Sequence, residues 1–207
     1  MKILVVDDHP IVRAGLRRLL ADEECDFREA ASGREALAIF REHRPDVVVL
    51  DLSMPGGGGL EVIGRFRVEN AAVRILVLSM HQDAVYARRA LQAGATGFIS
   101  KSAPPERLLE AIKEVAAGHG YIEHQIAQEL AFSNIRAGRS LLDELSSREL
   151  EILRLLGEGN SLGQIAEAIG VSYKTVANTC SQIKGKLGVA RTADLVRLAI
   201  QGELTSR

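Results

Sequence analysis

The sequence has few cysteines, no large excess of charge of either sign and no long hydrophobic run. Its two cysteines, Cys25 and Cys180, lie far apart without CxxC spacing, so neither a disulfide framework nor a zinc site is indicated. The formal net charge of −1 argues against a generally basic nucleic-acid binder or a membrane-surface protein, although it leaves local patches open. No apolar run approaches the roughly 18 residues that span a bilayer, and no charged-then-apolar leader precedes the first predicted strand. We therefore expect a cytoplasmic protein without a membrane partner.

Alternating strand and helix patterns occupy the first part of the chain. At 207 residues, of which 46% are hydrophobic, the chain is long enough for two domains with well-formed cores. Short apolar runs that end in turn residues predict five strands, at residues 3–6, 27–31, 47–51, 74–79 and 97–101. Helical spacing follows each strand. Strict alternation with right-handed crossovers predicts an α/β fold over residues 1–121, a five-stranded doubly wound parallel sheet with helices on both faces.

The rest of the chain carries no strand signal. Residues 122–141 have only weak helical spacing and are predicted to be a partly helical linker. Residues 142–207 predict an all-α domain of four helices. Ser146 and Glu149 form a capping box at the start of the first of these helices. The third helix has its apolar positions at i, i+4, i+7 and i+11, which are Val176, Cys180, Ile183 and Leu187.

Polar side chains at the predicted strand ends point to chemistry. Asp7 and Asp8 follow the first strand, and Asp51 ends the third. Carboxyl ends of parallel strands form the ligand-binding edge of such sheets, so the three acids are expected to converge. Because packed carboxylates repel, a hard cation such as Mg²⁺ is the natural neutraliser. Ser79 and Lys101 end the fourth and fifth strands, which completes a phosphoryl-transfer site with Asp51 as the nucleophile.

Other interpretations of these residues stay open at this point. Polar residues often end strands simply as loop formers. A phosphatase that uses an aspartyl-phosphate intermediate is a second candidate, but such enzymes usually carry DxD after one strand, and Asp51 is followed two residues on by Ser53. A nucleotide-driven ATPase is disfavoured, because Gly56 to Gly59 lacks the following Lys-Ser/Thr of a P-loop.

Three motifs in residues 1–121 resemble those of the receiver domain of bacterial response regulators. They are Val5-Val6-Asp7-Asp8-His9, Asp51-Leu52-Ser53-Met54-Pro55-Gly56 and Gly97-Phe98-Ile99-Ser100-Lys101. The resemblance implies that Asp51 accepts phosphate from a sensor histidine kinase. It also implies that Asp8, Asp51 and the Ser53 carbonyl ligate Mg²⁺, with Asp7 helping mainly through water. Ser79 and Lys101 would bind the phosphoryl oxygens, and Phe98 would be the aromatic switch residue, although a static core aromatic is an equal alternative.

Two residues depart from the receiver pattern. Ser102 follows Lys101 where many receivers have proline, so a cis peptide there would lack its favoured residue and would cost about 3 kcal/mol. Met80 follows Ser79 where a small residue is common. We expect Met80 to narrow access to the phosphorylation site and to slow hydrolysis.

The second domain contains the pattern of a helix-turn-helix. Residues 165–172 end a helix with a glycine-containing turn, and residues 173–176 begin a second, capped helix. With Leu145-Ser146-Ser147-Arg148-Glu149 before it and Lys186-Leu187-Gly188-Val189 after it, residues 142–207 resemble the DNA-binding domain of the NarL/FixJ (LuxR-type) response regulators. The resemblance implies a double-stranded DNA partner.

The third helix of this domain is the expected recognition helix. Asn178 and Gln182 lie opposite its apolar stripe and can make bidentate bonds to adenine, whereas lysines serve phosphates. The residues expected at the DNA are Tyr173, Lys174, Thr175, Asn178, Ser181, Gln182, Lys184 and Lys186. Ala177 and Thr179 stand where relatives frequently carry lysine and histidine, so the basic readout of those members does not transfer.

A single helix-turn-helix with few phosphate contacts would bind weakly, so a homodimer on DNA is expected. The resemblance suggests the last helix, with Leu195, Val196 and Leu198, as the interface. The sequence thus predicts a transcription regulator, not an enzyme, that is controlled by phosphate on Asp51, with RNA polymerase as a further candidate partner. A constitutive DNA binder whose receiver serves only for dimerisation is the alternative.

Overall fold

The chain forms two compact units, residues 1–133 and 134–207, each described by itself. The structure is a computed structural model that describes residues 1–54, 59–80, 84–136 and 141–201. The glycine-rich segment 55–58 and residues 137–140 of the predicted linker lie outside these ranges. Within them, no helix is both long and apolar enough to cross a membrane.

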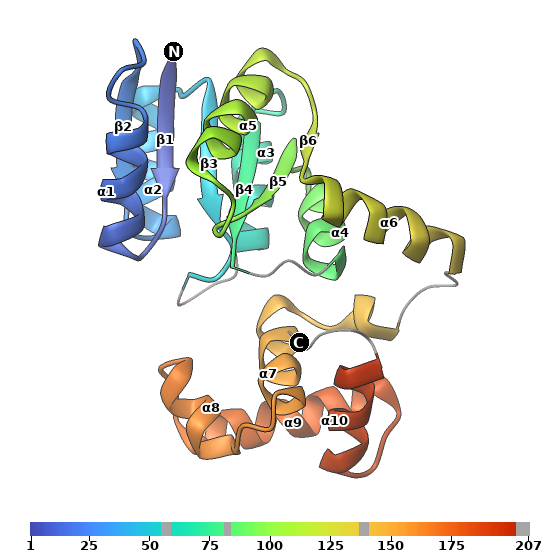
Figure 1. The fold of residues 1–207 in the computed structure, drawn as a ribbon. Helices are drawn as coiled ribbons and strands as arrows, with labels where there is room; N and C mark the ends of the chain where they lie inside the picture. The colour runs from blue at the N-terminus through green and yellow to red at the C-terminus, as the bar shows by residue number, and fades with distance from the viewer. Residues whose placement is uncertain (55–58, 81–83, 137–140, 202–207) are drawn as a thin grey trace. The chain divides into compact units, whose positions relative to one another are not determined.

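The first unit is a parallel sheet between two layers of helices (Figure 1). Its strands, counted over the described residues, are β1 (Lys2–Val6), β2 (Asp26–Ala30), β3 (Val47–Asp51), β4 (Arg74–Ser79), β5 (Gly97–Ser100) and β6 (Tyr121–Ile122), in the order β2-β1-β3-β4-β5-β6. Its helices are α1 (Pro10–Leu19), α2 (Gly33–His43), α3 (Gly59–Glu69), α4 (Ala84–Ala93), α5 (Pro105–Ala117) and α6 (His124–Arg136), whose residues 134–136 are counted in the second unit. The doubly wound parallel fold predicted from the alternation is confirmed.

Alternating strand residues build the two faces of the sheet. Ile3, Val49 and Leu76 belong to one buried cluster, which Leu16 of α1 and Ile112 of α5 complete. The side chains between them point to the opposite face, where the helices α2 and α3 pack against each other and the rings of Phe40 and Phe66 lie 4.7 Å apart. Burial on both faces explains the continuous apolar runs of the central strands.

The sixth strand differs from the prediction of five. Tyr121 and Ile122 pair in parallel with Gly97 and Phe98 at the edge of β5. A two-residue strand is too short to show the alternation by which strands are recognised in a sequence. The boundary predicted after Tyr121 falls inside this strand, and α6 begins two residues later.

The second unit is helical, as predicted. Its elements are a 3₁₀ turn (Leu141–Glu144) and the helices α7 (Ser147–Gly157), α8 (Leu162–Ala168), α9 (Tyr173–Leu187) and α10 (Thr192–Gln201). The predicted capping box of Ser146 and Glu149 is present at α7, and a second box of Ser161 and Gln164 begins α8. These reciprocal bonds satisfy backbone donors that the first turn of a helix leaves unpaired.

Candidate functional site

The carboxyl edge of the sheet gathers three acids from two neighbouring strands. Asp7 follows β1 and Asp51 ends β3, and each is only 1% exposed. Asp8 is partly exposed beside them. Ligand atoms of Asp7, Asp8, His9 and Asp51 all lie within 4.8 Å of one another. The convergence of the acids predicted from the strand ends is therefore what the fold produces.

Lys101 bridges two of these acids. Its ammonium Nζ lies 2.7 Å from Asp7 Oδ2 and 2.8 Å from Asp51 Oδ2, and its backbone N–H donates to the Ser79 carbonyl at 2.7 Å. Burial lowers the pKa of Lys101, but the carboxylates of Asp51 and Asp7 together outweigh burial and hold that pKa above its usual value. The peptide between Lys101 and Ser102 is trans. The lysine is thus a fixed positive charge at the sheet edge.

Asp51 is held in a poorly solvated position. Burial raises the pKa of its carboxyl group, and this effect outweighs the Lys101 ammonium and the Ser53 N–H, which both favour the ionised form. That N–H donates to Asp51 Oδ1 at 3.0 Å. One carboxylate oxygen therefore faces a backbone donor and the other faces a lysine. These two contacts fix the orientation of the carboxylate.

His9 is a neighbour of the acids that the sequence analysis did not assign a role. Its ring Nδ1 lies 3.1 Å from Asp7 Oδ1 and 3.0 Å from Asp8 Oδ1, and its backbone N–H donates to Asp7 Oδ1 at 2.8 Å. The position of His9 directly after Asp7 and Asp8 is the sequence feature that could have identified it as part of the site. The backbone bond and the bond from Arg13 Nη1 to the Asp7 carbonyl, at 2.8 Å, fix the turn that presents Asp7.

The other predicted receiver residues occupy the ends of the next two strands. Ser79 is the last residue of β4, fully buried, and in register with Ser100 of β5. Phe98 of β5 is also fully buried. Met80, expected to narrow access to the site, is 66% exposed. Ser53 is half-buried two residues beyond Asp51.

The helix-turn-helix consists of α8, a turn at Gly170 and α9. Gly170 has φ +67°, a left-handed conformation that favours glycine, and Ser172 caps α9 by accepting the N–H of Thr175. Val176, Cys180, Ile183 and Leu187 are the buried positions of α9, as the spacing predicted. Tyr173, Lys174, Thr175, Asn178, Ser181 and Gln182 are exposed, and Lys184 is half-buried. The polar stripe of α9 is thus open to solvent.

Lys186 has a different environment from the other predicted DNA contacts. Its Nζ lies 2.7 Å from Oε2 of Glu149, a residue that is 5% exposed and also accepts the backbone N–H of Ser146 at 2.6 Å. Burial raises the pKa of Glu149, but Lys186 and the Ser146 bonds outweigh it and hold the pKa below its usual value. The lysine therefore links α9 to the capping box of α7, a role that sequence reasoning missed because the partners lie 37 residues apart.

The burial of Leu195 corrects one part of the predicted dimer interface on α10. This side chain is fully buried, as is Ala199, because α10 packs its apolar stripe against α7 of the same unit. Leu195 is therefore a core residue and is not available to a partner. Val196 and Leu198 are half-buried, and Ile200 is 55% exposed.

We predict that Lys186→Ala weakens the second unit by about 1–2 kcal/mol, because it leaves a buried carboxylate with fewer donors. Since the pKa of Glu149 is lowered in the folded state, the stabilisation is present above its ordinary value near 4.3 and is lost as pH falls through the folded pKa. Denaturant unfolding at pH 7 and at pH 4 measures both effects. Lys174→Ala, which removes an exposed lysine of the same helix, is the control. Equal stability of the two variants at pH 7 would contradict the structural role of Lys186.

A doubly wound sheet with three acids and a lysine at its carboxyl edge, in a chain that also carries a helix-turn-helix, is the architecture of a response regulator. Comparison with known protein families supports this assignment. The model described as "Response regulator receiver domain" matches residues 3–113, and that of "Bacterial regulatory proteins, luxR family" matches residues 143–199. The chain therefore belongs to the response regulators, with a receiver domain and a LuxR-type DNA-binding domain, a family of transcriptional regulators.

Individual relatives span nearly the whole chain. The transcriptional activator protein ExaE of Pseudomonas putida is 41% identical over 99% of this chain and 98% of its own length. A solved LuxR-family response regulator from an Aurantimonas species is 42% identical, with a TM-score of 0.60 over 65% of this chain and 97% of that one. RcsB of Salmonella enterica serovar Typhimurium, solved on the promoter rprA with phosphomimetic BeF₃⁻, is 26% identical, with a TM-score of 0.63 over 95% and 96%.

Proposed function

We propose that Asp51 accepts a phosphoryl group from a sensor histidine kinase and that this controls the binding of double-stranded DNA by a homodimer. The observation that carries the proposal is the position of Asp51, buried at the sheet edge with Lys101 Nζ 2.8 Å from its carboxylate. Burying the charges of Asp51, Lys101 and Asp7 together costs stability, so a purely structural role is a poor explanation for them. A role of Asp51 as a phosphoryl acceptor explains their burial better.

The acids suit Mg²⁺. Asp8 and Asp51 would ligate the ion with the backbone carbonyl of Ser53, and Asp7 would contribute mainly through water. All these donors are oxygens, the ligands that Mg²⁺ prefers. Asp8 Oδ1 is buried, and apart from the His9 Nδ1 atom 3.0 Å away it has no hydrogen-bond partner, so a cation would complete its interactions. When bound, Mg²⁺ would neutralise the acids and attract the phosphoryl oxygens.

In the transfer step, a carboxylate oxygen of Asp51 attacks phosphorus, and the P–N bond to the kinase histidine breaks as the new O–P bond forms. Lys101 would leave its bond to Asp51 for a phosphoryl oxygen while it retains Asp7 as a partner. Ser79, at the end of the adjacent strand, would donate its hydroxyl to another phosphoryl oxygen. The Phe98 ring would turn inward when the Ser79 hydroxyl moves toward the phosphoryl group. Attack of water on the aspartyl phosphate would return the protein to its unphosphorylated state.

We assign the DNA contacts to α9. Asn178 and Gln182 would contact base edges in the major groove, with Tyr173, Thr175 and Ser181 beside them and with Lys174 and Lys184 at phosphates. Two copies would read two half-sites, paired through α10, where Val196, Leu198 and the exposed Ile200 replace the buried Leu195 as contacts. Such a regulator acts in the cytoplasm, where RNA polymerase at the promoter is a further partner.

The proposal is tested by incubating the purified protein with acetyl phosphate and Mg²⁺. We expect a phosphoryl group on Asp51, detected by mass spectrometry after borohydride trapping, and tighter binding to sites recovered by genome-wide mapping. Equal affinity with and without the phosphodonor would favour a constitutive regulator with the receiver as a dimerisation module. Turnover of a phosphomonoester would favour a phosphatase.

Substitutions on α9 separate base contacts from phosphate contacts. We predict that Gln182→Ala costs about 1–3 kcal/mol of binding on the specific site only, because a bidentate base contact is lost. Lys174→Ala is expected to weaken binding to every sequence and to reduce the slope of log affinity against log salt by about one. Fluorescence anisotropy over a salt series measures both, with Lys113→Ala in the receiver as the charge-matched control. Equal losses from Gln182→Ala on specific and scrambled DNA would exclude base readout by this residue.

A further inference from the structure

The segment after α5 lies against β5, the strand that directly precedes Lys101. Tyr121 and Ile122 form β6, which pairs with Gly97 and Phe98 of β5. The approach is close, because a Cβ built at Gly97 would lie 2.8 Å from the Tyr121 carbonyl oxygen. Residue 97 must therefore be glycine for this pairing. The segment lies beyond residue 113, where the match to the receiver model ends.

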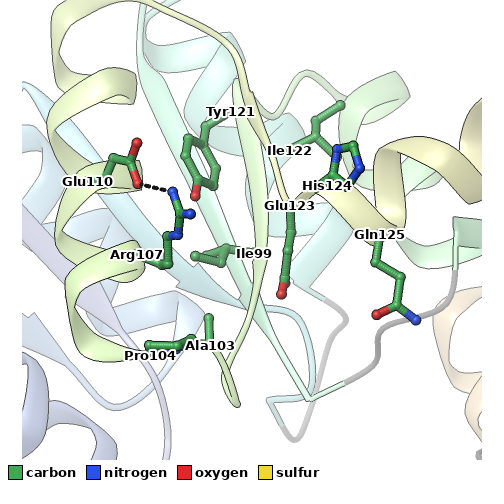
Figure 2. Close-up of a pocket in the computed structure, with 10 residues that line it drawn as sticks. All are labelled: Ile99, Ala103, Pro104, Arg107, Glu110, Tyr121, Ile122, Glu123, His124 and Gln125. Atoms are coloured by element: carbon green, nitrogen blue, oxygen red, sulfur yellow. Dashed lines mark hydrogen bonds and ion pairs between the residues drawn. The ribbon is translucent and has the colours of Figure 1, made fainter.

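Glu123, the residue after β6, makes three bonds that connect β5 to α6. Its backbone N–H donates to the Phe98 carbonyl at 3.3 Å, and its Oε2 accepts the backbone N–H of Ser100 at 3.0 Å. Its own carbonyl accepts the N–H of Ala127 at 2.9 Å, the first backbone bond of α6. Figure 2 shows Glu123 in the wall of a pocket that Ile99 and Arg107 also line.

The bond to Ser100 lies one residue from the phosphoryl site. Because β6 ends at Ile122, the side chain of Glu123 continues the pairing of β5 by one more residue. A carboxylate that accepts a backbone N–H makes one of the stronger kinds of hydrogen bond. On its other side, the end of β5 is held by the bond from Lys101 N–H to the Ser79 carbonyl at 2.7 Å. The backbone that carries Lys101 is therefore clamped between Ser79 and Glu123.

We infer that Glu123 is a positioning residue for phosphoryl transfer at Asp51 and that it couples a change in the bonding partner of Lys101 to the start of α6. The inference rests on the proposed function. When Lys101 changes partner from Asp51 to a phosphoryl oxygen, any shift of its backbone acts on the Ser100 N–H and so on Glu123. Since Glu123 also accepts the first bond of α6, the shift changes the start of the helix that leads along the chain into the second unit.

The test measures the rate at which acetyl phosphate with Mg²⁺ phosphorylates Asp51 in the full chain. We expect Glu123→Ala to slow phosphorylation about tenfold, because it removes the charge-assisted bond to the Ser100 N–H, one residue before Lys101. Glu123→Gln keeps an acceptor oxygen and is expected to recover most of the wild-type rate, which a general loss of packing would not permit. Glu129→Ala removes a carboxylate elsewhere in α6 and is expected to leave the rate unchanged.

A second measurement is independent of the stability of the variants. Amide hydrogen exchange of the wild type is compared in Mg²⁺ alone and in Mg²⁺ with beryllofluoride. We expect the protection of the Ser100 and Ala127 amides to change together.

The outcomes separate the two proposals. A wild type that acetyl phosphate fails to phosphorylate would overturn the proposed function. A phosphorylated wild type whose rate equals that of Glu123→Ala would overturn only the positioning role, as would a Glu123→Gln protein as slow as Glu123→Ala. Unchanged protection of Ala127 would overturn the connection to α6.

Discussion

Asp51→Asn is expected to bind DNA with an affinity that no longer responds to a phosphodonor. Asparagine has nearly the same size and shape, but its amide cannot form the acyl phosphate. Genome-wide mapping of bound DNA, with wild type and variant side by side, measures the effect in the cell. We expect the sites occupied under kinase-activating conditions to be lost or weakened in the variant. An unchanged occupancy map would contradict control through Asp51.

The same substitution is expected to stabilise the metal-free receiver. Burial raises the pKa of Asp51 in the folded state, so the folded protein favours the protonated acid. Relative stability is therefore greatest below the unfolded pKa near 3.9 and declines as pH rises through the folded pKa. At neutral pH the ionised group destabilises the fold, and a neutral amide removes that effect. Thermal unfolding in EDTA measures it, with the exposed Asp22→Asn as control. A lower melting temperature for Asp51→Asn would show that its bond to Lys101 outweighs the burial of its charge.

Lys101→Ala is expected to destabilise the metal-free receiver by about 3–5 kcal/mol, the range for removing one partner of a buried ion pair. Two carboxylates, Asp7 and Asp51, would lose the ammonium that lies 2.7 and 2.8 Å away. The pKa of Lys101 is raised in the folded state, so this stabilisation is complete below its ordinary value near 10.4 and is lost as pH rises through the folded pKa. Neutral pH is therefore the correct condition for the measurement.

Denaturant unfolding of the full chain, followed by amide exchange in β1 and β3, measures the loss in EDTA and again in Mg²⁺. We expect Mg²⁺ to restore part of it, because the cation supplies positive charge to the same acids. Lys113→Ala is the matched control, since it breaks an exposed ion pair with Glu23 that is worth less than about 1 kcal/mol. A loss no larger than that of Lys113→Ala would contradict the role given to Lys101.

Much of the receiver site was predictable because it depends on where apolar runs end. Val5-Val6 and Val49-Leu50 are each followed at once by an acid, and parallel topology brings such ends together. The exposed face of α9 was predictable for a similar reason, since Val176 and Cys180 fix the phase of the helix.

Contacts that do not follow from the parallel topology were not predictable. Helical spacing shows that Leu195 lies on an apolar stripe, but it does not tell whether the stripe covers the unit's own core or a partner. In the sequence, Lys186 cannot be distinguished from the other lysines of the helix, and only the fold shows that it pairs with Glu149. The pairing of β6 involves only two residues and depends on the space beside Gly97, and neither feature can be recognised in the sequence.

The short strand β6 also bears on how the receiver stays apart from other chains. Without it, β5 would present an open row of backbone donors and acceptors to solvent, and such edges recruit strands from neighbouring molecules. Tyr121 and Ile122 occupy the first part of that row, and the Glu123 carboxylate brings a negative charge to the next position. At this side the sheet therefore ends in a two-residue strand beside a negative charge, which offers too short a row to template pairing, so self-association through this edge is disfavoured.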